Sequence, residues 1–202
     1  MKIKISTASP DALSRETLIL GFFSDERPPK GYCGQVDWRL NGMISAEIAG
    51  GRISGYFLEK IACAFPRRIR VSRLLLFGMG ALTELTYDRL YNAGFEIVKT
   101  VNGIGATDLA LPMPAAGRGP LNLTGMTEAL ITGIFDGCAD APQRLLALGL
   151  EIPARDDHAY DVHRGLMQFR QNAGAADIEI MGSEDQMADG TDATGQGHPE
   201  KR

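Results

Sequence analysis

Cysteine is scarce in this chain, and the spacing that would give it a chemical role is missing. The 202 residues include three cysteines, Cys33, Cys63 and Cys138, which lie far apart and form no CxxC pair. An odd number of isolated cysteines argues against a disulfide framework and against a thiolate metal site. We therefore expect three small apolar side chains in a reducing compartment.

Long hydrophobic runs are absent as well. No apolar stretch approaches the roughly 20 residues that a membrane-spanning helix needs. The N-terminal segment MKIKISTASPDALSRETLIL also lacks the continuous apolar block of a signal peptide. These absences predict a cytoplasmic protein that does not bind membranes.

No part of the main body carries a strong excess of one charge. The net charge is −4, and residues 183–202 hold five acidic and two basic residues, which leaves 19 basic and 20 acidic residues in 1–182. A nearly neutral body is not suited to binding nucleic acid through bulk electrostatics. The terminal segment has almost no large apolar residues, so we expect one domain at 1–182 and a disordered polar tail at 183–202.

Signatures of catalysis are missing too. There is no GxSxG sequence, no cysteine beside a histidine, and only two of the three histidines, His158 and His163, precede the tail. These two are five positions apart, which separates them by roughly 140° around a helix, so they cannot bind one ion from a single regular helix. We therefore expect no catalytic residue, no metal site and no cofactor.

What the sequence does contain is an alternation of strand-like and helix-like segments. TLILGFFS and RLLLF are almost continuously apolar, as in strands covered on both faces. The expected strands are Lys2–Ser6, Thr17–Ser24, Gly55–Ala62, Arg73–Phe77, Asp108–Pro112 and Asp177–Met181. The order predicts an α/β fold of three layers, with a mixed, mostly parallel sheet between helices.

Four segments between these strands have helical spacing. In QVDWRLNGMISAEIAGG the apolar residues Trp38, Leu40, Met43, Ile44 and Ile48 share a broad face, and the segment ends at Gly50-Gly51. Further helices are expected at about 83–101, at about 124–136 with Thr124 as N-cap, and at about 156–172.

Glycine turns supply the candidate binding residues. The strand RLLLF ends at Gly78-Met79-Gly80, and a helix that follows such a turn can hold a phosphate with its first amides. The dinucleotide fingerprint would need another glycine at the position of Thr83, so a plain corner between strand and helix is the competing interpretation.

A second group of glycines flanks the strand expected at Asp108–Pro112. Gly103 and Gly105 precede this strand, and Arg118 follows it in a glycine-rich loop, so the three could line a ligand cleft. Alternatively, Gly103 is a helix C-cap and the prolines stiffen an ordinary loop. The candidate ligand-binding residues are Gly78, Met79, Gly80, Gly103, Gly105 and Arg118.

The order of these pieces resembles the N-terminal domain of the leucyl, or cytosol, aminopeptidases. The segments that carry the resemblance are VDWRLNGMISAEIAGGRISG, RLLLFGMG, DLALPMPAAG and MTEALITGIFDG. The matching positions are Asp37, Gly42, Gly51, Gly55, Gly78, Gly80, Ala129, Leu130, Gly133 and Phe135. The resemblance implies a macro-domain-like fold.

The resemblance also bears on function. The family binds two metal ions in a separate C-terminal domain, whose signature this sequence lacks, so no catalytic residue can be carried over. The first hypothesis is a non-catalytic domain that acts by self-association or by docking on a protein partner. The alternative, implied by macro domains, is a module that binds ADP-ribose or another nucleotide at the glycine loops. A second alternative is a related hydrolase with an unrecognised site.

Overall fold

A single sheet organises the molecule, for which the computed structural model describes residues 1–175 and 178–182. The strand order is β3-β4-β2-β5-β6-β1-β7, and every pairing is parallel except that of β3 with β4. The strands are β1 Lys2–Ser6, β2 Thr17–Phe22, β3 Lys60–Ala64, β4 Arg73–Gly78, β5 Asp108–Ala110, β6 Gly149–Pro153 and β7 Glu179–Met181.

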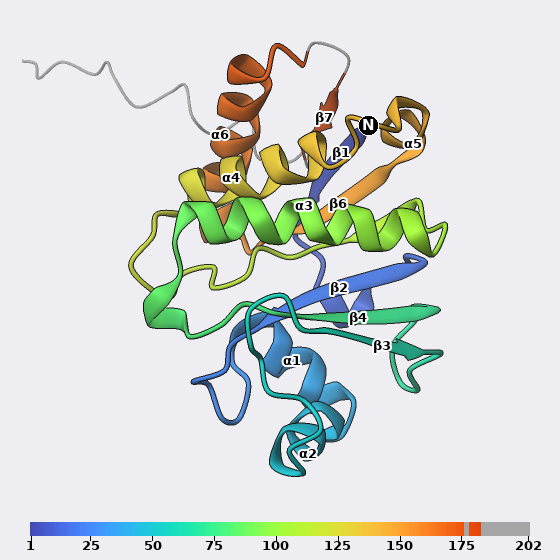
Figure 1. Cartoon of the computed structure of the whole chain (residues 1–202), viewed down its shortest axis with the longest axis vertical. Helices are drawn as coiled ribbons and strands as arrows, with labels where there is room; N and C mark the ends of the chain where they lie inside the picture. The colour runs from blue at the N-terminus through green and yellow to red at the C-terminus, as the bar shows by residue number, and fades with distance from the viewer. Residues whose placement is uncertain (176–177, 183–202) are drawn as a thin grey trace, which may run out of the picture.

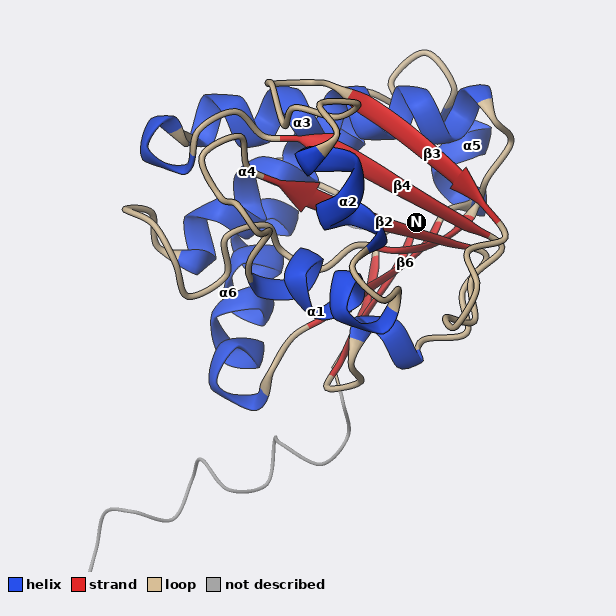
Figure 2. Cartoon of the chain, turned by 90° about the horizontal axis from the view of Figure 1, so that it is seen from below, coloured by secondary structure: helices blue, strands red, loops and turns tan. Residues whose placement is uncertain are grey.

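Helices cover both faces of this sheet (Figures 1 and 2). Helices α3, α4 and α6 lie on one side, and α1 and α2 lie on the other. The helices are α1 Gly31–Arg39, α2 Met43–Ala49, α3 Tyr87–Gly103, α4 Leu123–Asp136, α5 Pro142–Ala147 and α6 Asp156–Asn172. The predicted three-layer fold with a mixed, mostly parallel sheet is confirmed.

The neighbouring strands β2 and β4 each contribute residues to both hydrophobic cores. On β2, Leu18 and Leu20 point into the core beneath α1 and α2, whereas Ile19 points into the core beneath α3, α4 and α6. On β4, Leu74 and Leu75 divide in the same way. Alternating strand residues face opposite sides of a sheet, so a continuously apolar strand must be covered on both faces.

The helix expected across QVDWRLNGMISAEIAGG is two helices. Asn41 and Gly42 adopt left-handed backbone conformations, with φ of 61° and 75°, and they end α1 before α2 begins. The Asp37 carboxylate then accepts hydrogen bonds from the backbone N–H groups of Ile44 and Ser45, at 2.7 and 3.1 Å. Trp38 lies outside the buried face of α1 and is 76% exposed.

Two further expectations need correction, and one strand was missed. The strand expected at Gly55–Ala62 starts five residues later, because the Glu59 carboxylate binds the N–H groups of Ser54 and Gly55 and holds that segment as a loop. The N-cap of α4 is Asn122, not Thr124, since its side chain accepts a hydrogen bond from the Gly125 N–H. The strand β6 was not predicted at all.

Near the two ends of the described chain, strand β1 and helix α6 have the bounds predicted from the sequence. β7 begins at Glu179, while Asp177 and the tail at 183–202 lie outside the described residues. None of the helices in 1–175 and 178–182 has the length and apolarity that crossing a bilayer requires.

Candidate ligand-binding site

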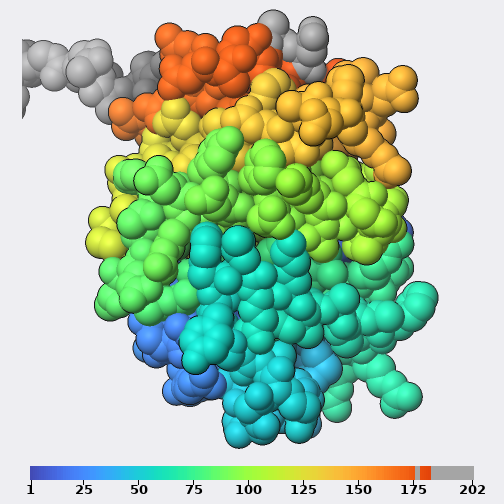
Figure 3. Space-filling model, viewed as in Figure 1, coloured from blue at the N-terminus to red at the C-terminus, as the bar shows by residue number. Residues whose placement is uncertain are grey.

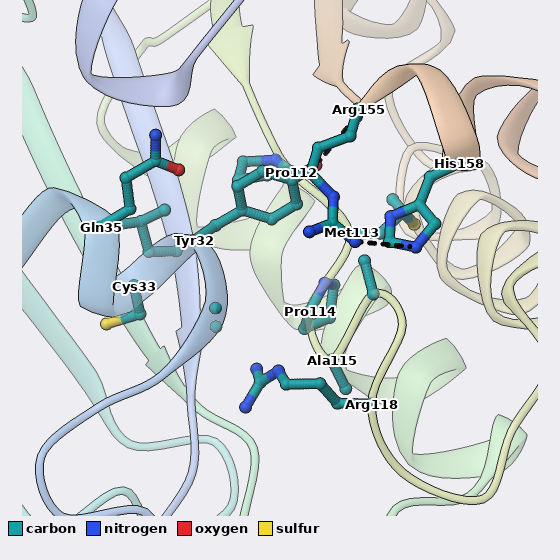
Figure 4. A pocket seen from close by; sticks show the side chains of 14 residues that line it. Tyr32, Cys33, Gln35, Pro112, Met113, Pro114, Ala115, Arg118, Arg155 and His158 are labelled. Carbon is teal, nitrogen blue, oxygen red and sulfur yellow. Dashed lines mark hydrogen bonds between the residues drawn. The ribbon is translucent and has the colours of Figure 1, made fainter. Parts of the chain in front are cut away.

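A cavity of about 160 Å³ lies at the carboxyl ends of β2 and β5 (Figure 4). The chain leaves β2 for α1 on one face of the sheet, and it leaves β5 for α4 on the opposite face. Two neighbouring parallel strands whose connections diverge in this way leave a crevice at their carboxyl ends. The cavity is therefore where an α/β sheet most often binds a ligand.

The lining combines an apolar floor with polar side chains from three segments. The floor is the loop Pro112–Ala116, which follows β5. Tyr32 and Gln35 come from α1, Arg118 from the loop after β5, and Arg155 and His158 from the start of α6. In Figure 4, Tyr32 lies on one side of the cavity, with Arg155 and His158 facing it from the other. Two guanidinium cations and one imidazole thus line the same small cavity.

Arg118 is held by an internal ion pair. Its guanidinium pairs with the Glu26 carboxylate, whose side chain is 8% exposed, and lies 5.7 Å from the centre of the Phe23 ring. Gly31, with a φ of 58°, is needed here, because a Cβ atom would lie 2.8 Å from the guanidinium. Among the described residues, Nε of Arg118 is buried without a hydrogen-bond partner.

Arg155 and His158 form the opposite wall. Nη2 of Arg155 lies 3.3 Å from Nε2 of His158 and 3.3 Å from an oxygen of the exposed Asp157 carboxylate. The backbone N–H of Arg155 donates to the Tyr32 hydroxyl at 3.2 Å, which ties α1 to the start of α6. Gly117 faces the imidazole edge closely, since a Cβ there would lie 2.9 Å from His158.

Cys33 lines the same cavity, but its thiol is suppressed as a nucleophile. Burial, with smaller contributions from the charges of Asp37 and Glu26, raises its pKa to about 12. The thiolate is the reactive form, so at pH 8 Cys33 holds roughly one thiolate in ten thousand molecules.

We expect Cys33 to resist alkylation in the native protein. Cys63 on the edge strand β3 is partly exposed, whereas Cys33 and Cys138 are buried. Iodoacetamide at pH 8 should modify Cys63 first and leave Cys33 unmodified until denaturant is added, as peptide mass spectrometry would show. Labelling of native Cys33 as fast as Cys63 would contradict this assignment.

The turn at Gly78-Met79-Gly80 lies apart from the cavity and is filled by the protein itself. The N–H of Gly78 donates to the Glu59 carbonyl, that of Met79 to the Phe22 carbonyl, and that of Gly80 to the Gly55 carbonyl. The Met79 side chain is buried in the core. All three backbone donors of this turn are therefore engaged by protein carbonyls.

Gly103 and Gly105 lie at the amino end of β5, whereas Arg118 lies beyond its carboxyl end. Gly103 is the last residue of α3, and both glycines precede β5, whereas Arg118 follows that strand. A Cβ at Gly103 or Gly105 would meet no atom within 4 Å. Of the six residues proposed from the sequence, Arg118 alone lines the cavity.

Sequence reasoning missed Arg155 and Tyr32 and weighed His158 only as a metal ligand. Arg155 follows β6. Because β6 was not predicted, nothing in the sequence indicated that Arg155 lies at the end of a strand. In residues 1–175 and 178–182, no three histidine, cysteine, aspartate or glutamate side chains gather to form a metal site. His158 instead contacts an arginine beside the cavity.

Comparison with known proteins decides the family. The model of the cytosol aminopeptidase family, N-terminal domain, matches residues 19–138. The chain belongs to this family. Relatives named probable cytosol aminopeptidase from Pseudomonas syringae pv. tomato and Geobacter sulfurreducens are 23% and 27% identical over 137 and 136 residues. These matches cover 68% and 67% of this chain but 27% of each relative. The family resemblance expected from the sequence is confirmed.

Solved structures confirm the macro-domain-like fold of this aminopeptidase N-terminal domain. A macrodomain of Oceanobacillus iheyensis with MES bound has a TM-score of 0.67 at 8% identity, covering 83% of this chain and 92% of that one. A Trypanosoma brucei macrodomain in complex with ADP-ribose has a TM-score of 0.65 at 12% identity, covering 81% and 68%. A tomato leucine aminopeptidase mutant has a TM-score of 0.57 at 14% identity, covering 82% and 35%.

Proposed function

We propose that this domain is a non-catalytic binding module that takes a phosphate-bearing ligand, with a nucleotide or ADP-ribose as the first candidates. The observation that carries the proposal is the convergence of Arg118, Arg155 and His158 on one cavity at the carboxyl ends of β2 and β5. Guanidinium groups are well matched to phosphate oxygens. Macrodomains of the same fold have been solved with ADP and with ADP-ribose, which supports this ligand class.

A thermal-shift titration tests the proposal. ADP-ribose, ADP and AMP are each added up to 10 mM, with adenosine and ribose as phosphate-free controls. A ligand at 100 times its Kd stabilises the native state by about 2.7 kcal/mol, which for a domain of this size raises Tm by roughly 5–10 °C. We expect such a rise with at least one phosphate compound and none with the controls. If no phosphate compound changes Tm, the proposal is wrong.

The edge of the sheet favours a second candidate function, self-association. Within residues 1–175 and 178–182, β3 pairs only with β4, so its other side is an edge of the described sheet. Figure 3 shows the segment around β3 at the molecular surface. Tyr56 before this strand and Phe65 after it are 73% and 80% exposed. An unpaired edge strand with exposed aromatic residues at both ends is suited to pairing with a second copy.

Ala62→Pro tests self-association without disturbing the existing ladder. The Phe65 N–H donates to the Ser72 carbonyl and the Gly78 N–H donates to the Glu59 carbonyl, so by alternation the N–H of Ala62 points away from β4. Proline there removes an outward donor and no bond to β4. Light scattering at 100 μM should show a dimer for the parent and a monomer for A62P, with equal Tm at low concentration. A monomeric parent would exclude this second function.

A further inference from the structure

The cavity is too small for a whole nucleotide, and this limits which part of a ligand it can enclose. Its volume is about 160 Å³, whereas pockets that enclose drug-sized ligands begin near 300 Å³. A single phosphate group fits such a space, and the rest of a larger ligand would have to remain outside it.

The two arginines at the cavity differ in how completely their charges are compensated. Arg118 pairs with a carboxylate that is itself buried, so the two charges balance inside the protein. The Arg155 side chain is 64% exposed, and its contact with a carboxylate is a 3.3 Å interaction with Asp157, whose side chain is 65% exposed. An exposed pair of this kind is weak and easily exchanged. Arg155 is therefore the cation that an incoming anion can recruit.

His158 adds a hydrogen-bond donor beside this cation. A guanidinium can only donate, so Nε2 of His158 accepts from Nη2 of Arg155, which leaves the proton of the neutral ring on Nδ1. Nδ1 is buried and has no hydrogen-bond partner among the described residues, and the Asp157 carboxylate oxygen lies 3.9 Å away. Nε of Arg118 is the second buried N–H at the cavity without a partner.

Buried N–H groups without an acceptor are uncommon in native proteins, and two of them belong to side chains that line this one cavity. We propose that the cavity binds one terminal phosphate group, with Arg155 as its main cation, His158 as a neutral donor and Arg118, neutralised by Glu26, as a fixed wall. The proposal rests on the proposed function and narrows it to inorganic phosphate and phosphomonoesters. ADP-ribose, whose phosphates lie within the molecule, would not be enclosed.

Isothermal titration of the full chain with inorganic phosphate, AMP and ADP-ribose tests this assignment. We expect phosphate and AMP to bind, and ADP-ribose to bind at least tenfold more weakly than AMP. Arg155→Gln should weaken AMP binding at least tenfold. Arg52→Gln, at an exposed arginine remote from the cavity lining, is the matched control and should bind like the parent.

The outcomes separate this inference from the proposed function. Binding of AMP and inorganic phosphate that is lost in R155Q and kept in R52Q supports both. Tight ADP-ribose binding that R155Q leaves unchanged overturns the terminal-phosphate site but retains a phosphate-ligand module. Equal AMP binding by R155Q and the parent also overturns the site. Absence of binding by all three compounds overturns both. His158→Asn, whose amide nitrogen matches the position of Nδ1, should retain more AMP affinity than His158→Ala.

Discussion

Gly133→Ala is expected to destabilise the domain by about 3 kcal/mol or more, because this glycine is where two helices touch backbone to backbone. A Cβ at Gly133 on α4 would overlap the Tyr91 carbonyl oxygen of α3, and a Cβ at Gly94 on α3 would overlap the Leu130 carbonyl oxygen of α4. Backbone carbonyls cannot turn aside as a flexible side chain can. The helices would have to separate, and the core between them would lose its close packing.

Urea unfolding of G133A and G103A measures this effect against a matched control. Gly103 is also a helical glycine, at the end of α3, but a Cβ there would meet nothing within 4 Å. Alanine at Gly103 should leave stability unchanged or raise it by up to about 1 kcal/mol, since alanine favours helix. A G133A midpoint equal to that of the parent would show that α3 and α4 do not pack as closely as described.

Arg15→Ala should cost about 3 kcal/mol, the second large effect. Arg15 precedes β2 and bridges two carboxylates, with Nε 2.5 Å from Glu151 and Nη1 2.8 Å from Asp108. The Glu151 side chain is 7% exposed on β6, so removal of the guanidinium leaves a buried carboxylate without its cation. The same bridge joins the segment before β2 to β5 and β6, and its loss should loosen the contacts between these neighbouring central strands.

Chemical unfolding of R15A and R52A distinguishes a buried bridge from a surface pair. Arg52 pairs with Glu47, but both side chains are substantially exposed, so R52A should unfold at the same urea concentration as the parent. A double variant, Arg15→Met with Glu151→Leu, should recover much of the loss because no charge is then left buried. If R15A is as stable as R52A, the bridge does not stabilise the fold.

Local signals were sufficient for much of the fold. Strand β1 and helix α6 follow their predicted bounds, because an alternating strand and a helix with a regular apolar stripe can be recognised within their own residues. β6 was missed because GLEIP is short and places Glu151 between apolar residues. The carboxylate at Glu151 is tolerated only because Arg15, far away in sequence, pairs with it.

The break between α1 and α2 has a local sequence signal, but the apolar spacing around it led to the prediction of one helix. Asn41-Gly42 is a turn dipeptide, and both residues take positive φ. The apolar spacing on either side made one continuous helix look plausible. The Asp37 carboxylate, which reaches the first N–H groups of α2, accounts for the second start.

The candidate site depended least on local sequence. Arg118 was identified because it follows an expected strand in a glycine-rich loop. The glycines at 78, 80, 103 and 105 looked equivalent to it, but in the structure they lie elsewhere, and the amides at 78–80 are bound to protein carbonyls. A glycine turn that holds a ligand and one that holds a neighbouring loop have the same sequence pattern.

The sequence by itself determined the family, the three-layer α/β fold class and the need for two covered sheet faces, because these depend on residues close together in the chain. Tertiary structure alone decided which glycines touch another backbone and which side chains meet at the cavity. Tyr32 and Arg155 are 123 positions apart and are joined by a hydrogen bond. The physical reason is that crossover connections between parallel strands place the carboxyl ends of all these strands at the same end of the sheet. No local sequence pattern indicates which strand ends become neighbours there.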